Sequence, residues 1–113
     1  MKILTEAVAL DELKEMATVF CGSLVKAVVD VERKLMAVDA ELHSDLEGML
    51  LEDGSKQKDI WGINLHPDKQ GDEFVEFDSI INMRPSQKNR SRGVEDEETR
   101  GQIVEVVKRW VRK

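Results

Sequence analysis

The stretch FDSIINMRPSQKNRSR, residues 77–92, joins the last predicted strand of the chain to its last predicted helix. It begins with the alternation of apolar and polar residues that is typical of a strand. Pro85 ends that strand, because proline cannot donate a hydrogen bond to a sheet. The stretch carries four cations, Arg84 just before this proline and Lys88, Arg90 and Arg92 after it. The sequence therefore places a basic loop between a hydrophobic hairpin and a C-terminal helix.

The segment before this loop predicts a β-hairpin. Its strands are residues 60–65 and 73–84, and the connection HPDKQGD contains the Pro and Gly typical of a turn. The alternating apolar residues are Trp61, Ile63 and Leu65 on the first strand, and Val75, Phe77, Ile81 and Met83 on the second. These two patterns share a face if Ile63 lies near Phe77. The opposite face then carries polar side chains together with Ile60 and Ile80.

The rest of the chain predicts three helices and three further strands. The helices are expected at residues 9–20, at 40–51 with Asp39 as N-cap, and at 96–111. The strands are expected at residues 2–4, 24–31 and 35–38, and the second of these is apolar on both faces, as a central strand is. The predicted order is β-α-ββ-α-ββ-α. This order indicates one α+β domain over residues 1–113, with helices packed on a single mixed or antiparallel sheet of four or five strands.

Composition excludes several classes of protein. The chain of 113 residues has no apolar run near the length that a membrane helix needs, and acidic residues lie where a signal peptide would be apolar. Its one cysteine, Cys21, excludes an intramolecular disulfide framework and looks like a buried, unreactive thiol. These features predict a cytoplasmic protein without a membrane partner.

Charge is distributed unevenly along the chain. Residues 1–83 hold 8 Lys and Arg against 18 Asp and Glu, a net charge of −10, whereas residues 84–113 hold 9 against 5, a net charge of +4. The basic segment 84–113 either packs against the acidic rest of the protein or binds an external anion. Nucleic acid is a weak candidate for that anion, because the chain has no Tyr and only three Phe for base stacking.

The basic loop is the first candidate binding site. Phosphate recognition uses planar Arg side chains with short amide and hydroxyl donors. Such residues in and near the loop are Asn82, Arg84, Asn89, Arg90 and Ser91, and Asn64 is predicted to lie on the same polar sheet face. The alternative is a solvated loop whose side chains bond their own backbone.

The second candidate site is one edge of the predicted second helix. His43 and Glu47 are four residues apart and share a face, so they can form an acid–base pair or two ligands of a metal. A third ligand would have to come from Asp30 or Asp78, and the sequence contains no established metal motif, so we predict no metal site. The alternative is a histidine at the helix boundary that bonds a neighbouring acid.

Several blocks of the sequence resemble a family of small uncharacterised prokaryotic proteins, a domain of unknown function. The blocks are KAVVD (26–30), ELHSDLE (41–47), GSKQ (54–57), WGIN (61–64), SIINMRP (79–85) and NRS (89–91). The resemblance covers nearly the whole chain and implies a stand-alone cytosolic domain. It implies no activity, substrate or cofactor.

Three functional hypotheses follow. The first is a binding module for a small anion or a phosphorylated ligand, held by the loop at residues 82–92. The second is a small hydrolase-like enzyme that uses His43 with nearby carboxylates, which requires His43 to lie close to Arg84 or Asn82. The third is a homo-oligomerising or protein-interaction domain with no small ligand. The sequence does not specify a cofactor.

Overall fold

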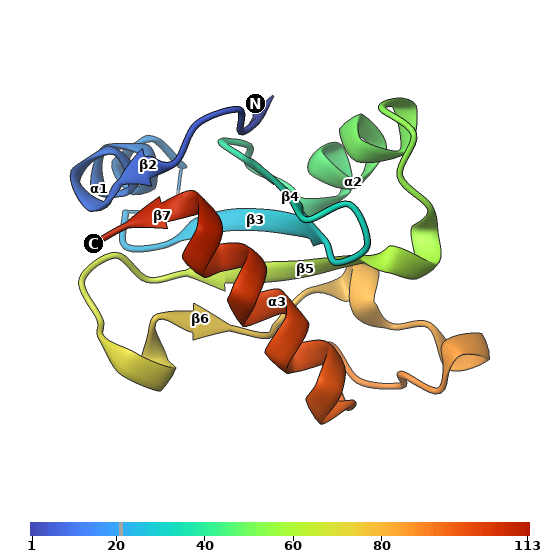
Figure 1. The fold of residues 1–113 in the computed structure, drawn as a ribbon. Coiled ribbons are helices and arrows are strands. Elements are labelled where there is room, and N and C mark those ends of the chain that lie inside the picture. The colour runs from blue at the N-terminus through green and yellow to red at the C-terminus, as the bar shows by residue number, and fades with distance from the viewer. Residues whose placement is uncertain (21) are drawn as a thin grey trace.

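Strand β3, Val25–Asp30, is the centre of a five-stranded sheet (Figure 1). The computed structural model describes residues 1–20 and 22–113, so the interpretation of Cys21 lies outside the described residues. The order of strands is β1 (Lys2–Ile3), β4 (Leu35–Val38), β3, β5 (Ile60–Leu65) and β6 (Val75–Glu76), and every neighbouring pair is antiparallel. The predicted α+β class, with three helices on one sheet, is confirmed.

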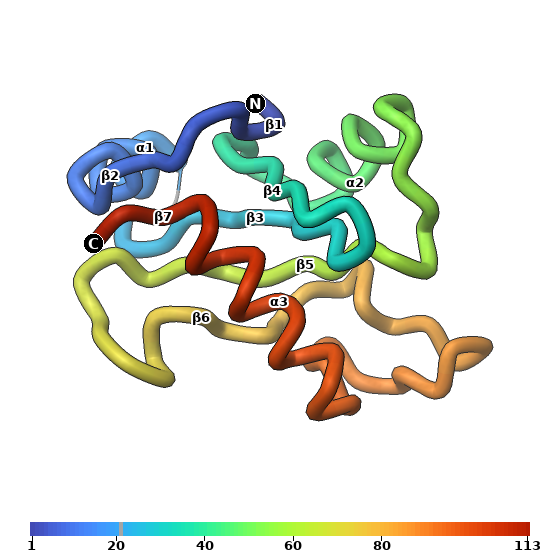
Figure 2. Tube along the Cα trace, viewed as in Figure 1, coloured from blue at the N-terminus to red at the C-terminus, as the bar shows by residue number. Residues whose placement is uncertain are grey.

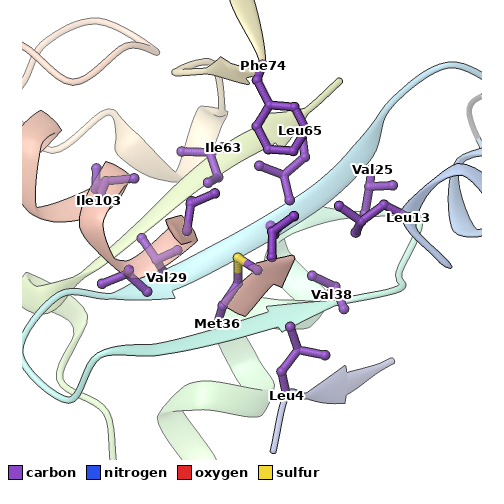
Figure 3. Packing of buried hydrophobic residues seen from close by; sticks show 14 of the residues in the cluster. Leu4, Leu13, Val25, Val29, Met36, Val38, Ile63, Leu65, Phe74 and Ile103 are labelled. Carbon is purple, nitrogen blue, oxygen red and sulfur yellow. The ribbon is translucent and has the colours of Figure 1, made fainter. Parts of the chain in front are cut away.

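The helices cover both faces of the sheet. Helices α1 (Leu10–Phe20) and α3 (Glu97–Trp110) pack on one face, and α2 (His43–Glu52) packs on the other. The larger core layer combines residues from the strands with Leu4, Leu13, Phe74 and Ile103, as Figure 3 shows. The smaller layer, under α2, includes Val28, Ala37, Leu46, Leu50 and Ile60. Alternate residues of β3 and β5 supply the two layers, which is why both strands are apolar on both faces.

The turn between β3 and β4 has neither Gly nor Asn, and a buried aspartate replaces them. One carboxylate oxygen of Asp30 accepts hydrogen bonds from the backbone N–H groups of Glu32 and Arg33, both at 2.9 Å. The other accepts from the hydroxyl of Ser55 at 2.6 Å. Asp30 is therefore committed to the turn, and not to the metal site for which it was considered.

The start of α2 differs from the prediction. The helix begins at His43 and not at Ala40, with Leu42 in the N-cap position. Asp39 is no N-cap: it has a φ of +73°, a left-handed conformation that Asp tolerates better than most residues, and it turns the chain at the end of β4.

The predicted second strand of the hairpin is mostly not a strand. Strand β6 ends at Glu76, and its pairing with β5 has the predicted register, because Asn64 lies opposite Glu76 and Leu65 opposite Val75. Beyond it the chain forms the short 3-10 helices η3 (Ile80–Asn82) and η4 (Pro85–Gln87), and Figure 2 shows this segment leaving the sheet before it returns to α3. Two further 3-10 turns, η1 (Gln57–Asp59) and η2 (Gly71–Glu73), precede β5 and β6.

This change alters three predicted side-chain positions. Ile81 packs in the layer under α2, on the opposite face from Ile63, and Met83 is half exposed. Ile60 is fully buried in the same layer and does not lie on an open polar face. The hydroxyl of Ser79 accepts a hydrogen bond from the N–H of Ile81, which favours a turn where the alternation predicted a strand.

A second, two-stranded sheet joins the two ends of the described chain. Strand β2 (Val8–Ala9) pairs in parallel with β7 (Val111–Arg112), so that Val8 lies opposite Val111. This pair was not predicted, because two-residue strands have no periodic pattern. No helix in the described part of the chain is long and apolar enough to cross a bilayer.

Candidate functional site

Asn82 pairs with the free edge of β5 as a strand would. Its side-chain oxygen accepts a hydrogen bond from the N–H of Gly62 at 2.8 Å, and its amide nitrogen donates to the carbonyl of Gly62 at 2.9 Å. The same nitrogen donates to the carbonyl of Arg92 at 3.0 Å. Asn82 is fully buried, so its side chain satisfies backbone groups that water does not reach.

Gly62 is required by this arrangement. A Cβ at this position would lie 2.6 Å from both Cβ and Oγ of Ser79. The neighbour that leaves no room for a side chain at position 62 is the buried Ser79, which comes from the same segment as Asn82.

Arg84 continues this pairing toward the start of β5. One terminal nitrogen donates to the carbonyl of Ile60 at 2.6 Å, and the other donates to the carbonyl of Gln57. The guanidinium lies 4.2 Å from the centroid of the Trp61 ring. Burial lowers the pKa of Arg84, whereas the charge of Glu47 raises it. The fold therefore uses both terminal nitrogens of Arg84, while its buried Nε has no hydrogen-bond partner among the described residues.

Asn89 and Asn64 are similarly engaged. The amide nitrogen of Asn89 donates to the carbonyls of Asn82 at 2.7 Å and Gly93 at 2.8 Å, and its oxygen accepts from the N–H of Glu95 at 2.9 Å. The amide nitrogen of Asn64 donates to Glu76 at 2.9 Å. Among the residues that the structure describes, the buried oxygen of Asn64 has no hydrogen-bond partner.

Arg90 and Ser91 hold an anion that belongs to the chain itself. Their backbone N–H groups donate to one carboxylate oxygen of Glu95, at 2.6 and 2.9 Å. These bonds lower the pKa of the Glu95 carboxyl group. The loop therefore has the geometry of an anion-binding turn, and an internal carboxylate fills it.

His43 and Glu47 have separate surroundings. The Nε2 atom of His43 lies 2.8 Å from the carbonyl oxygen of Ile63, and burial lowers the pKa of the imidazole below its usual range, while that hydrogen bond acts in the opposite direction. The charges that act on His43 are those of Lys26, Asp78 and Arg92, whereas Glu47 acts on Arg84. Asp78 is itself paired with Arg92 at 2.7 Å.

The predicted polar blocks thus converge at the edge of β5, where they bond to the backbone. His43 and Asn82 bond to adjacent residues of β5, Ile63 and Gly62, so the helix edge and the loop do meet. No group of three or more His, Cys, Asp or Glu side chains within residues 1–20 and 22–113 could hold a metal ion.

A groove that sequence reasoning missed lies between α3 and β6. We call it the α3–β6 groove; its volume is about 830 Å³. Its apolar lining is Phe74, Val75, Phe77, Val104, Val107 and Val111, and its charged lining is Arg100, Lys108, Lys113 and Asp72. The excess of cations after residue 83 was the sequence signal for it. The loop was taken as the candidate site because four cations lie within its nine residues 84–92, whereas the groove cations are spread over residues 100–113.

The sequence as a whole matches one protein family over residues 2–110, and that family is described as a protein of unknown function, DUF5674. The chain belongs to this family. No curated protein matches the chain, and no solved structure does either.

The family's description agrees with the resemblance found in the sequence and states no activity. The chemistry available to this member of the family must therefore be judged from its own geometry. At the edge of β5, the polar side chains of the predicted site are bonded to backbone groups of the protein. The α3–β6 groove instead combines an apolar floor with cations, which is the composition of a ligand-binding surface.

Proposed function

We propose that this domain binds an amphipathic organic anion in the α3–β6 groove. The ligand has an apolar body and a carboxylate or phosphate head. The observation that carries the proposal is the lining of the groove, which is apolar on its floor and has three cations against one acid around it. Ligand sites are commonly concave, largely apolar and furnished with a few polar groups that orient the ligand.

The charge of the groove is opposite to that of the protein. The chain has a net charge of −6, yet Arg100, Lys108 and Lys113 gather around this one surface. Such a local excess of positive charge attracts anions and raises their rate of association. The exposed ion pair of Lys108 with Glu105, 3.7 Å long, weakens this excess only slightly.

Arg100 is the group that we expect to bind the anionic head. Its Nε donates to the carbonyl of Val94, and its guanidinium lies 5.4 Å from the centroid of the Phe77 ring. These contacts orient the side chain and leave its two terminal nitrogens without a hydrogen bond among the described residues. Two parallel N–H donors match the two oxygens of a carboxylate or phosphate.

The proposal keeps the ligand class that the sequence suggested and moves its position. In the loop at residues 82–92, the polar groups of Asn82, Arg84 and Asn89 are bonded to backbone, and Glu95 occupies the N–H groups of Arg90 and Ser91. An external anion would have to displace these partners. The groove requires no such displacement.

The other two hypotheses have less support. A hydrolase would need the Nε2 of His43, which is bonded to the carbonyl oxygen of Ile63. A subunit interface formed by Ile60 and Ile80 would need both side chains at the surface. Ile80 is 69% exposed, but Ile60 is fully buried.

The test is a calorimetric titration with decanoate and decyl phosphate, with decanol as the uncharged comparison. We expect saturable binding of at least one anion and weaker binding of decanol. Changing Arg100→Gln should weaken anion binding about tenfold, which corresponds to about 1.4 kcal/mol. The matched control is Arg109→Gln, since Arg109 is exposed on the same helix but lies outside the groove.

Two results would overturn the proposal. One is the absence of saturable binding for both anions at millimolar concentration. The other is an equal effect of the two arginine variants, once circular dichroism has shown that both are folded.

A further inference from the structure

The α3–β6 groove continues past Phe74 into a second hollow of about 550 Å³. The two hollows share Gly71, Phe74 and Lys113. The remaining lining of the second hollow comes from α1 and the loop between β5 and β6: Leu10, Lys14, Pro67, Asp68, Lys69 and Gln70. The two hollows therefore adjoin, and a ligand long enough to occupy both would follow a path past Phe74 and Lys113.

The second hollow adds cations at the far end of this path. Lys14 and Lys69 line it, against the single acid Asp68. The ammonium of Lys113 lies at the junction, 3.8 Å from the centroid of the Phe74 ring. The path thus has Arg100 at one end, an apolar floor between, and Lys14 and Lys69 at the other end.

The loop that carries Lys69 has a defined shape. The N–H of His66 donates to the carbonyl of Phe74 at 2.8 Å, and the N–H of Lys69 donates to the carbonyl of His66 at 3.0 Å. These bonds close the loop beside Phe74, so the position of Lys69 relative to the groove is fixed by backbone contacts.

The two ends are far enough apart to require an extended ligand. Arg100 and Lys108 are eight residues apart on one helix, which corresponds to about 12 Å at 1.5 Å per residue. The second hollow lies beyond Lys108, next to Lys113. Leu10, Pro67 and Phe74 line this hollow and can contact an apolar chain, while Lys14 and Lys69 beside them offer positive charge to a group at the end of that chain.

We propose that the ligand is anionic at both ends, with an apolar chain between, as in a long α,ω-dicarboxylate. This inference rests on the proposed function, because it assumes that the α3–β6 groove binds an anion. It adds that Lys14 and Lys69 bind a second anionic group, while Arg100 binds the first.

The experiment compares ligands with the same fourteen-carbon chain, which is long enough to extend past Lys108. Tetradecanedioate has a carboxylate at both ends, its monomethyl ester has one, and tetradecanoate has one with an apolar tail. We expect the wild-type protein to bind tetradecanedioate about tenfold more tightly than the other two. The double variant Lys14→Gln/Lys69→Gln should lose this preference and keep its affinity for tetradecanoate.

The matched control is Lys56→Gln/Lys58→Gln, which removes two exposed lysines that lie outside both hollows and should leave the preference unchanged. Equal binding of the diacid and its monoester by the wild type would overturn this inference and leave the proposed function standing. An equal loss of affinity for all three ligands in the Lys14/Lys69 variant would also overturn it. Failure of all three ligands to bind the wild type would overturn the proposed function, and this inference with it.

Discussion

Replacing Asn82 with Ala is expected to lower the free energy of unfolding by about 4 kcal/mol. The change leaves the N–H and carbonyl of Gly62 unpaired at a buried position, and each buried unpaired group costs about 1–3 kcal/mol. At about 0.05–0.15 kcal/mol per residue, a domain of 113 residues has a total stability of about 6–17 kcal/mol. The variant should therefore be folded but clearly less stable.

Urea unfolding, followed by the fluorescence of Trp61 and Trp110, measures this loss. Asn82→Asp is the informative companion, because Asp still accepts from the N–H of Gly62 but cannot donate to its carbonyl and places a charge in a buried site. It should be at least as destabilising as Asn82→Ala. Ser86→Ala is the surface control, since Ser86 is exposed in the same segment, and it should change stability by less than about 0.5 kcal/mol.

A loss of stability below about 1 kcal/mol for Asn82→Ala would refute the view that the side chain of Asn82 supplies the hydrogen bonds that a neighbouring strand would make to Gly62. It would mean that water enters and satisfies Gly62, and Asn82 would again be free for a ligand. A normal stability for Asn82→Asp would have the same consequence, because it would show that the donor half of the amide is not needed.

Two further predictions concern the same edge of β5. Gly62→Ala should destabilise the protein by about 1–3 kcal/mol, because the new methyl group overpacks against Ser79. Adding Ser79→Gly to this variant should recover part of the lost stability. If Gly62→Ala alone unfolds in urea like the wild type, the close contact between residues 62 and 79 is contradicted. Burial lowers the pKa of folded His43, so the contribution of His43 to stability is fully present above the unfolded pKa of about 6.5 and is lost as pH falls through the folded pKa. The variant His43→Gln should therefore lose less stability than the wild type when pH is lowered from 7.5 to 5.5. An equal loss of stability in the two proteins would argue against a buried neutral imidazole.

Much of the architecture could be predicted because it depends on local patterns. The central position of β3 follows from apolar residues on both of its faces, and the register of β5 with β6 follows from matching Ile63 with Phe77. Helix α3 has acids in its first turn and Asp96 as N-cap, whose carboxylate accepts from the N–H of Thr99 at 2.9 Å, so its start was predicted within one residue.

The errors arise where a distant contact outweighs the local pattern. The alternation after Glu76 predicts a strand, but Asn82 and Arg84 pair with β5 through their side chains. The backbone of this segment is therefore free to form the 3-10 helices η3 and η4. A loop rich in Asn and Arg has the same sequence whether these side chains bind a ligand or the backbone. Only the position of β5 distinguishes the two cases.

The groove could not be predicted for a related reason. Its cations are two residues of α3 and Lys113, which follows β7, and the further cations of the second hollow come from α1 and the loop after β5. No two of Arg100, Lys108 and Lys113 are adjacent in the sequence, so no motif marks them.

The pairing of β2 with β7 determines when the groove comes into existence during synthesis. Contacts between residues far apart in sequence form late, and a chain made from its N-terminus keeps Val8 unpaired until Val111 has been added. Val111 and Lys113 also form one wall of the groove, and Lys113 completes the second hollow. A nascent chain that still lacks β7 and Lys113 therefore lacks part of the lining of both hollows.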